Sequence, residues 1–105
     1  LNIDIDMLFG NKIKELRDEQ GVLQHQLAAL LEIDTPMFSK IERGDRKAKR
    51  EQVVKLAGYF HQDEKEMLTL WLADKFIDAV KDVQDRELCV DAIILAQEKI
   101  KNLQQ

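Results

Sequence analysis

The chain is poor in the residues that cross-link or interrupt a polypeptide, since its 105 residues include one Cys, one Pro and four Gly. A lone cysteine, Cys89, cannot form a disulfide within the chain, which fits a reducing compartment. The scarcity of Gly and Pro leaves long segments for helices, which the abundant Leu, Ala, Glu, Lys and Gln favour. No segment keeps the apolar-polar alternation of strands. We therefore expect an all-α protein.

Also absent are the patterns that mark membrane proteins and common enzyme sites. No apolar run reaches the roughly 18 residues of a transmembrane helix and no signal-peptide layout is present, so we expect a cytoplasmic protein without membrane contact. His25 and His61 are isolated, Cys89 has no neighbouring His, and no Gly-rich phosphate loop or paired-Cys metal motif occurs. We expect no enzyme activity, no catalytic residue, no metal, no cofactor and no small-molecule ligand.

Helix ends are readable at several points along the chain. Gly21 and Gly44 are typical of the residue after a helix, whereas Asp34 starts one and Asp63 forms a capping box with Glu66. The breaks predict six helices, near residues 8–20, 24–31, 35–43, 49–60, 64–83 and 86–103. The length fits one domain with a modest core, and residues 1–7 are interpreted as an N-terminal extension without a functional role.

The segment from Asp34 to Gly44 has two unlike faces when it is placed on a helical wheel. Met37, Phe38 and Ile41 fall together on an apolar face. The opposite arc is polar and cationic and holds Thr35, Pro36, Ser39, Lys40 and Arg43. A short helix of this kind fits the major groove of DNA, where Lys donates to guanine O6 and N7 and Thr or Ser meets several base edges.

Three segments occur in a characteristic order and spacing: "KIKELRDEQG", "QHQLAALLEIDTPMFSKIERG" and "QVVKLAGYF". In this combination the chain resembles the helix-turn-helix regulators typified by lambda repressor and Cro, the XRE-type family. The resemblance covers roughly Phe9 to Leu72. It implies a lambda repressor-like five-helix domain, which here has an extended fifth helix and an additional C-terminal helix.

The resemblance also implies contacts with double-stranded DNA. In the family the start and middle of the third helix read bases, and these positions are Thr35, Pro36, Ser39 and Lys40. A Gln that opens the second helix and the residue before the closing Gly contact phosphate, which implies this role for Gln24 and Arg43. Pro36 has no side-chain donor and can add only apolar contact. Apart from the resemblance, the same residues fit an ordinary solvated helix face.

An ion pair inside the domain is a further implication of the resemblance. Many members pair an Arg of the first helix with a Glu near the end of the third, and the matching residues are Arg17 and Glu42. Two positions depart from the family pattern. Leu23 stands where a Ser, Thr or Asn usually caps the second helix, and Glu32 stands where many relatives have a turn-forming Gly.

Nine apolar residues at helical spacing are interpreted as plain core rather than as a binding surface. They are Ile13, Leu16, Leu27, Ala28, Leu31, Phe38, Ile41, Leu56 and Ala57.

Charge is unevenly distributed along this acidic chain of net charge −4. Residues 1–61 hold ten acids and ten bases, whereas residues 62–105 hold ten acids and six bases. Residues 40–55 contain seven basic and three acidic residues. This local excess of positive charge suits the release of counterions from DNA phosphates. A solvated loop also explains such a run. Its place after the reading helix favours phosphate contacts by Arg46, Lys47, Lys49 and Arg50.

The C-terminal part predicts a helical hairpin. Its first helix carries an apolar stripe at three- or four-residue spacing, made of Leu68, Leu72, Phe76, Ala79 and Val83, with Asp74, Asp78 and Asp82 on the wet side. The next helix is apolar nearly all round. A 4-3-4-3 seam that could seat a partner helix consists of Cys89, Ile93, Ala96, Ile100 and Leu103. We expect this seam to form a homodimer, and the alternative is a hairpin that folds back over the domain.

Together these features predict a DNA-binding domain at residues 8–72 and a C-terminal dimerisation extension at residues 73–105. The expected function is a sequence-specific transcriptional regulator, a repressor or a controller of restriction-modification type, that binds an inverted-repeat operator as a homodimer. The alternative is an antitoxin or another partner-binding helix-turn-helix subunit, whose apolar C-terminal surface would hold a different protein.

Overall fold

The computed structural model describes residues 7–103, and within them it contains six α-helices and no strand. The helices are α1 (Leu8–Gln20), α2 (Gln24–Leu31), α3 (Thr35–Arg43), α4 (Arg50–Tyr59), α5 (Glu64–Val80) and α6 (Arg86–Asn102). The all-α prediction is confirmed, and the helix bounds differ from the expected ones by three residues at most. Two compact units are present, Leu1–Lys75 and Phe76–Gln105, and α5 belongs to both.

The helix ends follow from local chemistry. Asp34, Asp63 and Asp85 each accept a hydrogen bond from a backbone N–H in the first turn of the helix that follows. Gly21 and Gly44 end α1 and α3 with φ of 66° and 83°, a left-handed conformation that glycine adopts without a steric cost. At these five positions the helices therefore start or end where the sequence signals predict.

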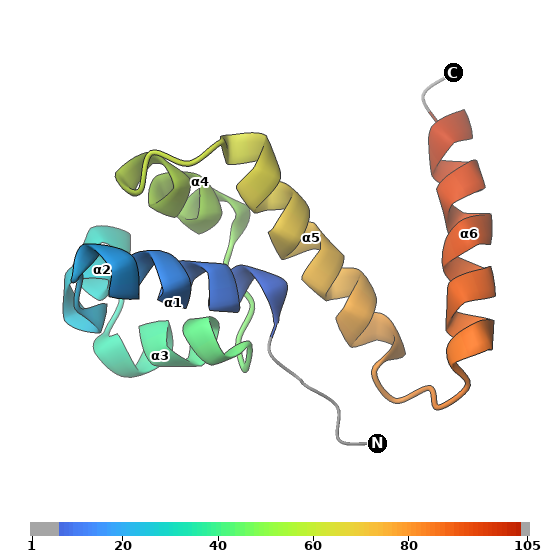
Figure 1. Ribbon diagram of the computed structural model, residues 1–105, viewed down its shortest axis with the longest axis horizontal. Coiled ribbons are helices and arrows are strands. Elements are labelled where there is room, and N and C mark those ends of the chain that lie inside the picture. Colours follow the sequence, from blue (N-terminus) through green and yellow to red (C-terminus); the bar gives the residue numbers. More distant parts are fainter. Residues whose placement is uncertain (1–6, 104–105) are drawn as a thin grey trace. The chain divides into compact units, whose positions relative to one another are not determined.

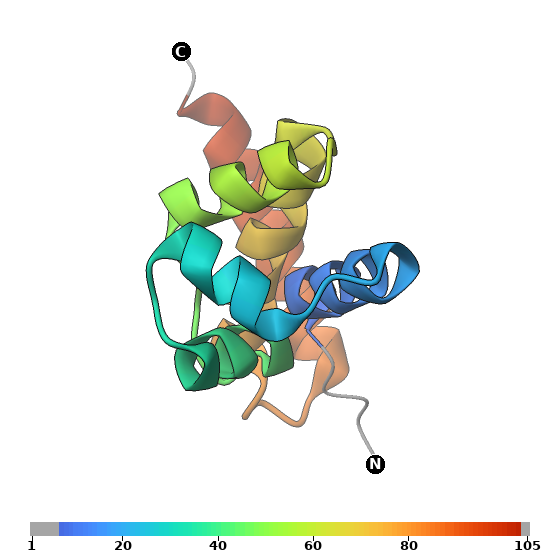
Figure 2. The same ribbon diagram turned by 90° about the vertical axis from the view of Figure 1, so that its left-hand side faces the viewer.

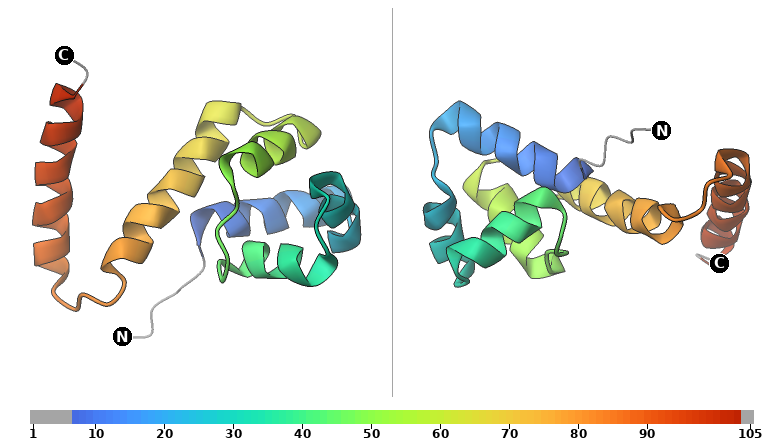
Figure 3. Two further views of the ribbon diagram at one scale, coloured as in Figure 1. Left: turned by 180° about the vertical axis from the view of Figure 1, so that it is seen from behind. Right: turned by 90° about the horizontal axis from the view of Figure 1, so that it is seen from below.

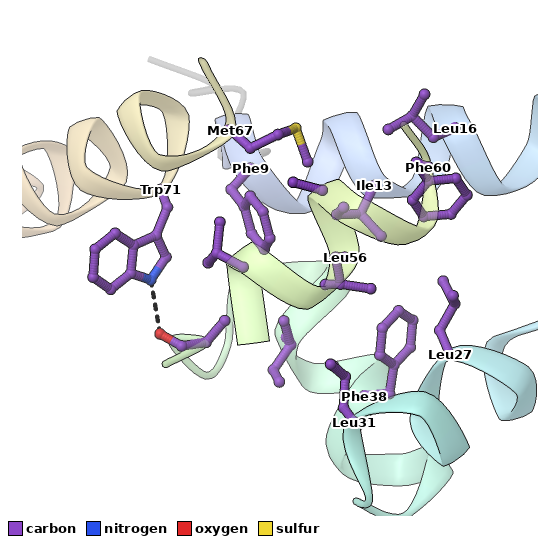
Figure 4. Close-up of a cluster of buried hydrophobic side chains, with 14 of the residues drawn as sticks. Phe9, Ile13, Leu16, Leu27, Leu31, Phe38, Leu56, Phe60, Met67 and Trp71 are labelled. Carbon is purple, nitrogen blue, oxygen red and sulfur yellow. Dashed lines mark hydrogen bonds between the residues drawn. The ribbon is translucent and has the colours of Figure 1, made fainter. Parts of the chain in front are cut away.

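In the first unit α3 packs against both α1 and α2, and α2 also packs against α4. Figure 1 and the left view of Figure 3 show α2 at the end of α1, and Figure 2 shows the unit from that end. All nine predicted core residues are buried, which confirms that interpretation. The core also contains residues that were not predicted, namely Phe9, Val22, Ala48, Val53, Phe60, Met67 and Trp71. Figure 4 shows part of this core. Burying several aromatic and aliphatic side chains in this way is the main favourable term of folding.

Close contact between α1 and α3 depends on Gly10. A Cβ atom at this position would fall on the carbonyl group of Glu42, so only glycine lets the two backbones approach so closely. Gly10 therefore sets the distance between α1 and the helix that presents the proposed base-reading residues.

The fifth helix anchors two other segments of the first unit. Trp71 donates from Nε1 to the carbonyl of Ala48 at 2.7 Å, as drawn in Figure 4, and Met67 lies in the core beside it. Asp74 accepts from the backbone N–H groups of Leu8 at 2.8 Å and Phe9 at 2.9 Å. These are first-turn donors of α1 that have no partner within their own helix.

The prediction that Asp74 faces water is wrong, because its side chain is only 4% exposed. Sequence periodicity marked it as polar and therefore as solvated, whereas its carboxylate is buried as the N-terminal cap of α1. The buried side of α5 in the first unit is formed by Met67, Trp71 and Asp74. The predicted apolar stripe is therefore wrong in large part, because Leu72, Phe76, Ala79 and Val83 are exposed and Leu68 is half-buried.

The second unit consists of the last residues of α5, a short connection and α6. No residue of α6 is buried, and six of its large apolar side chains are exposed: Leu88, Val90, Ile93, Ile94, Leu95 and Ile100. Within this unit, Phe76 joins Ile93, Ala96 and Ile100 in lining an apolar concavity of about 300 Å³. None of the helices in residues 7–103 combines the length and apolarity needed to cross a lipid bilayer.

Candidate nucleic-acid interface

Two buried side chains fix the rotation of α3 about its axis. Phe38 and Ile41 point into the core, with exposed fractions of 0% and 4%. The predicted reading positions lie on the remaining faces, where Pro36 and Lys40 are exposed and Thr35 and Ser39 are half-buried. Because the core holds the apolar face, these four side chains lie along one edge of the unit. Such a helix can enter the major groove without disturbing the core.

Arg43 is held at the end of α3 by two side chains. Its Nη1 donates to Ser39 Oγ at 2.7 Å and its Nε donates to Asp45 Oδ2 at 3.1 Å. The Ser39 hydroxyl keeps its own hydrogen as a donor, while Lys40 has no ion pair or hydrogen bond from its side chain to any residue in 7–103. The predicted base-reading and phosphate-binding residues are therefore neighbours, and Ser39 and Arg43 bond directly.

Arg17 and Glu42 form a bidentate ion pair between α1 and α3. Arg17 donates from Nε to Glu42 Oε2 at 2.9 Å and from Nη2 to Oε1 at 3.1 Å, and its Nη1 donates to the carbonyl of Val22 at 3.3 Å. The hydrogen bond to Glu42 raises the pKa of Arg17 above its ordinary value, against the opposing effect of burial. The guanidinium thus links α1 to α3 and to the turn before α2.

Gln24, the predicted phosphate ligand at the start of α2, belongs to the same network. Its Nε2 donates to Glu42 Oε1 at 2.8 Å. One amide hydrogen remains for a further acceptor, because a carboxamide nitrogen carries two. The structure therefore brings Arg17, Gln24 and Glu42 together from three helices.

At the N-termini of α2 and α4 a Gln side chain bonds back to the residue before the helix, a feature that the sequence analysis did not identify. The residues before them, Leu23 and Lys49, have no side-chain oxygen, so neither caps the first-turn N–H groups. Instead, Gln26 accepts from the N–H of Leu23 at 2.7 Å and Gln52 accepts from that of Lys49 at 2.8 Å. The Gln three residues after each cap was the available signal. Both helices present first-turn donors and a positive dipole end, which favour an anion.

The basic segment after α3 is tied to the domain through its one apolar residue. Ala48 is buried, and its carbonyl accepts the Trp71 hydrogen bond. The predicted phosphate ligands on either side are exposed, except for the half-buried Lys47; they are Arg46, Lys47, Lys49 and Arg50. Anchoring at Ala48 holds these cations near the start of α4 instead of leaving them on a free loop.

The predicted dimerisation residues lie in the second unit. In the sequence they are far from the proposed DNA-binding residues. Ile93, Ala96 and Ile100 line the apolar concavity, Cys89 is half-buried and Leu103 is exposed. Phe76 is an additional lining residue that the seam argument did not include. Among the described residues, no group of three or more His, Cys, Asp or Glu side chains could hold a metal ion.

Known proteins resemble the chain in fold and in part of its sequence. A crystal structure of a transcriptional regulator from Listeria innocua aligns with a TM-score of 0.55 at 23% identity, over 94% of this chain and 97% of that one, a likeness of fold. Control protein C.MunI from Mycoplasma sp. is 46% identical over 44 residues, which are 41% of this chain and 60% of that protein, less than two thirds of its length. The helix-turn-helix family model HTH_3 matches residues 13–66, slightly more than half of the chain. The chain therefore belongs to the helix-turn-helix family of DNA-binding regulators.

Proposed function

We propose that the protein is a sequence-specific transcriptional regulator that binds an inverted-repeat operator as a homodimer. The observation that carries the proposal is the outward polar face of α3, whose C-terminal end bonds to the uncapped start of α2 through Gln24 and Glu42 and leads into the anchored basic segment. In this proposal Thr35, Pro36, Ser39 and Lys40 read bases. The phosphate contacts come from Gln24, Arg43, Arg46, Lys47, Lys49 and Arg50.

The controller type, which times the expression of restriction and modification enzymes, is the regulator class that we favour. Its support is the 46% identity with Control protein C.MunI over 44 residues. Selection of bound sites from random DNA tests the proposal, and an inverted repeat with half-sites about 34 Å apart is the expected result. No enrichment over bulk DNA would refute it.

Base reading by Lys40 is tested with Lys40→Ala. Loss of a directed base contact should cost about 1 to 3 kcal/mol in each half-site of the selected site, with little change on unrelated DNA. Lys65→Ala is the matched control, because Lys65 is an exposed lysine of α5 outside the proposed interface. If Lys40→Ala weakens binding to both DNAs equally, Lys40 contacts phosphate rather than a base.

The homodimer is proposed because α6 exposes more apolar surface than a small domain usually leaves in water. Charging the seam with Ile93→Asp and Ile100→Asp should bury unpaired carboxylates in any dimer. We expect a folded monomer that binds a full operator about as weakly as a half-site. Sedimentation, circular dichroism and titration on both sites measure this.

The double variant Ile94→Asp and Leu95→Asp is the control, because these exposed side chains lie on the same helix away from the seam. Dissociation of the control but not of the seam variant would place the interface on the other face. A second candidate function, a subunit that holds a different protein, rests on the same exposed surface. A monomer that shows no operator enrichment but binds a defined partner protein through α6 would support it.

A further inference from the structure

A polar concavity of about 340 Å³ lies between α1 and α3 in the first unit. Gln24, Ser39 and Arg43, which we propose to contact DNA, line it together with three residues of α1: Asn11, Lys14 and Arg17. The side chains of Asn11 and Lys14 are one helical turn apart, so they project from the same face of α1. Neither has a role in the proposed function so far.

The described lining residues give this concavity a positive charge. Among them Glu42 is the only acidic residue, and both of its carboxylate oxygens accept hydrogen bonds from Arg17, which compensates its charge. Within residues 7–103, Lys14 has no ion-pair partner, and the side chain of Asn11 has no hydrogen bond. An exposed ammonium group and a free carboxamide therefore face a space that is already lined by proposed DNA ligands.

The lining residues also limit what the concavity can hold. Its neighbours on α3 and α2 are a proposed base reader, Ser39, and a proposed phosphate ligand, Gln24. A DNA strand that passes from Ser39 to Gln24 lies at the edge of the major groove. There it presents its phosphates, and not its base edges, to the concavity. Lysine suits this position because it binds phosphate as a point charge without demanding a planar partner.

We propose that this concavity binds a backbone phosphate of the operator, with Lys14 and Asn11 as donors from α1. Arg17 and Gln24 line the same concavity and keep N–H groups that their hydrogen bonds to Glu42 and Val22 do not use. The inference rests on the proposed function, and it makes α1 a third DNA-contacting element beside α2 and α3. Because a phosphate carries no sequence information, these contacts add affinity and fix the register of α3 without choosing bases.

The test compares Lys14→Gln with Lys12→Gln on the selected operator over a range of salt concentrations. Lys12 is on the same helix, about 200° away around its axis, and lies 3.6 Å from Glu15, so it gives the same charge change outside the concavity. We expect Lys14→Gln to weaken binding about tenfold per half-site, on selected and unrelated DNA alike, and to lower the slope of log K against log [salt] by about 0.9 per half-site, or about 1.8 for the dimer. Lys14→Arg should keep the slope.

A neutral methylphosphonate placed at each operator position in turn identifies the phosphate. With the symmetric phosphate of both half-sites made neutral, one pair of positions should weaken the wild type as much as Lys14→Gln does, and the two changes together should cost no more than either alone. Additive losses at every position would overturn the proposal, as would a Lys14→Gln variant that matches Lys12→Gln. A wild type that selects no DNA site would instead refute the proposed function itself.

Discussion

Removing the carboxylate of Glu42 should destabilise the DNA-binding unit well beyond the loss of a surface ion pair. Glu42→Ala removes two hydrogen bonds from Arg17 and one from Gln24. Arg17 then keeps the long hydrogen bond to the carbonyl of Val22 and a 3.9 Å ion contact with the exposed Asp18. A charge that was paired across α1 and α3 becomes nearly isolated.

The size of the loss follows from how little water reaches the pair. The side chains of Arg17 and Glu42 are 14% and 6% exposed, which is closer to a buried pair than to a surface one. Breaking a buried pair costs about 3 to 5 kcal/mol, whereas an exposed pair is worth under about 1 kcal/mol. The residual exposure of Arg17 allows partial solvation, so we expect about 3 kcal/mol. The corresponding drop in Tm is roughly 12 to 24 °C for a unit of this size.

Urea unfolding without DNA measures this prediction, and a double-mutant cycle isolates the pair. Glu42→Gln, which keeps one acceptor oxygen, should lose about half as much as Glu42→Ala. Arg17→Met combined with Glu42→Leu should be more stable than Glu42→Ala, because it leaves no buried charge without a partner. If Glu42→Ala unfolds within about 0.5 kcal/mol of the wild type, the pair is solvated and the reasoning is wrong.

Three further predictions concern stability and are measured by thermal or urea unfolding. Gly10→Ala should destabilise the protein by about 1 to 3 kcal/mol, because the added Cβ falls on the carbonyl of Glu42. Gly58→Ala is the control: its Cβ meets nothing within 4 Å, and it should stabilise by about 0.5 to 1 kcal/mol. Equal effects of the two substitutions would contradict the close approach of α1 and α3. Asp74→Ala leaves two N–H groups of α1 uncapped and should cost about 2 kcal/mol, a loss that a fully solvated Asp74 would not show. Glu32→Gly should stabilise by about 1 kcal/mol by relieving a residue with φ of 59°, and a destabilised variant would show that this turn carries no strain.

The sequence by itself determined the helices and most of the core. Caps such as Asp34 and Gly44 act within one turn of the chain, and the apolar period of a helix marks the face that must leave water. Both signals are local, so they predict element bounds and burial without knowledge of the partner elements. The order of the motifs also predicted the family.

The tertiary structure decided which polar groups are buried and which residues meet. Asp74 is a charged residue, and in the sequence it is expected to face water. It is buried only because the start of α1 lies against it. Asn11 and Lys14 are ordinary surface residues in the sequence, and they line a site because Gly10 lets α1 approach α3 closely. Such pairings depend on contacts between residues that are far apart in the chain, and local periodicity carries no information about them.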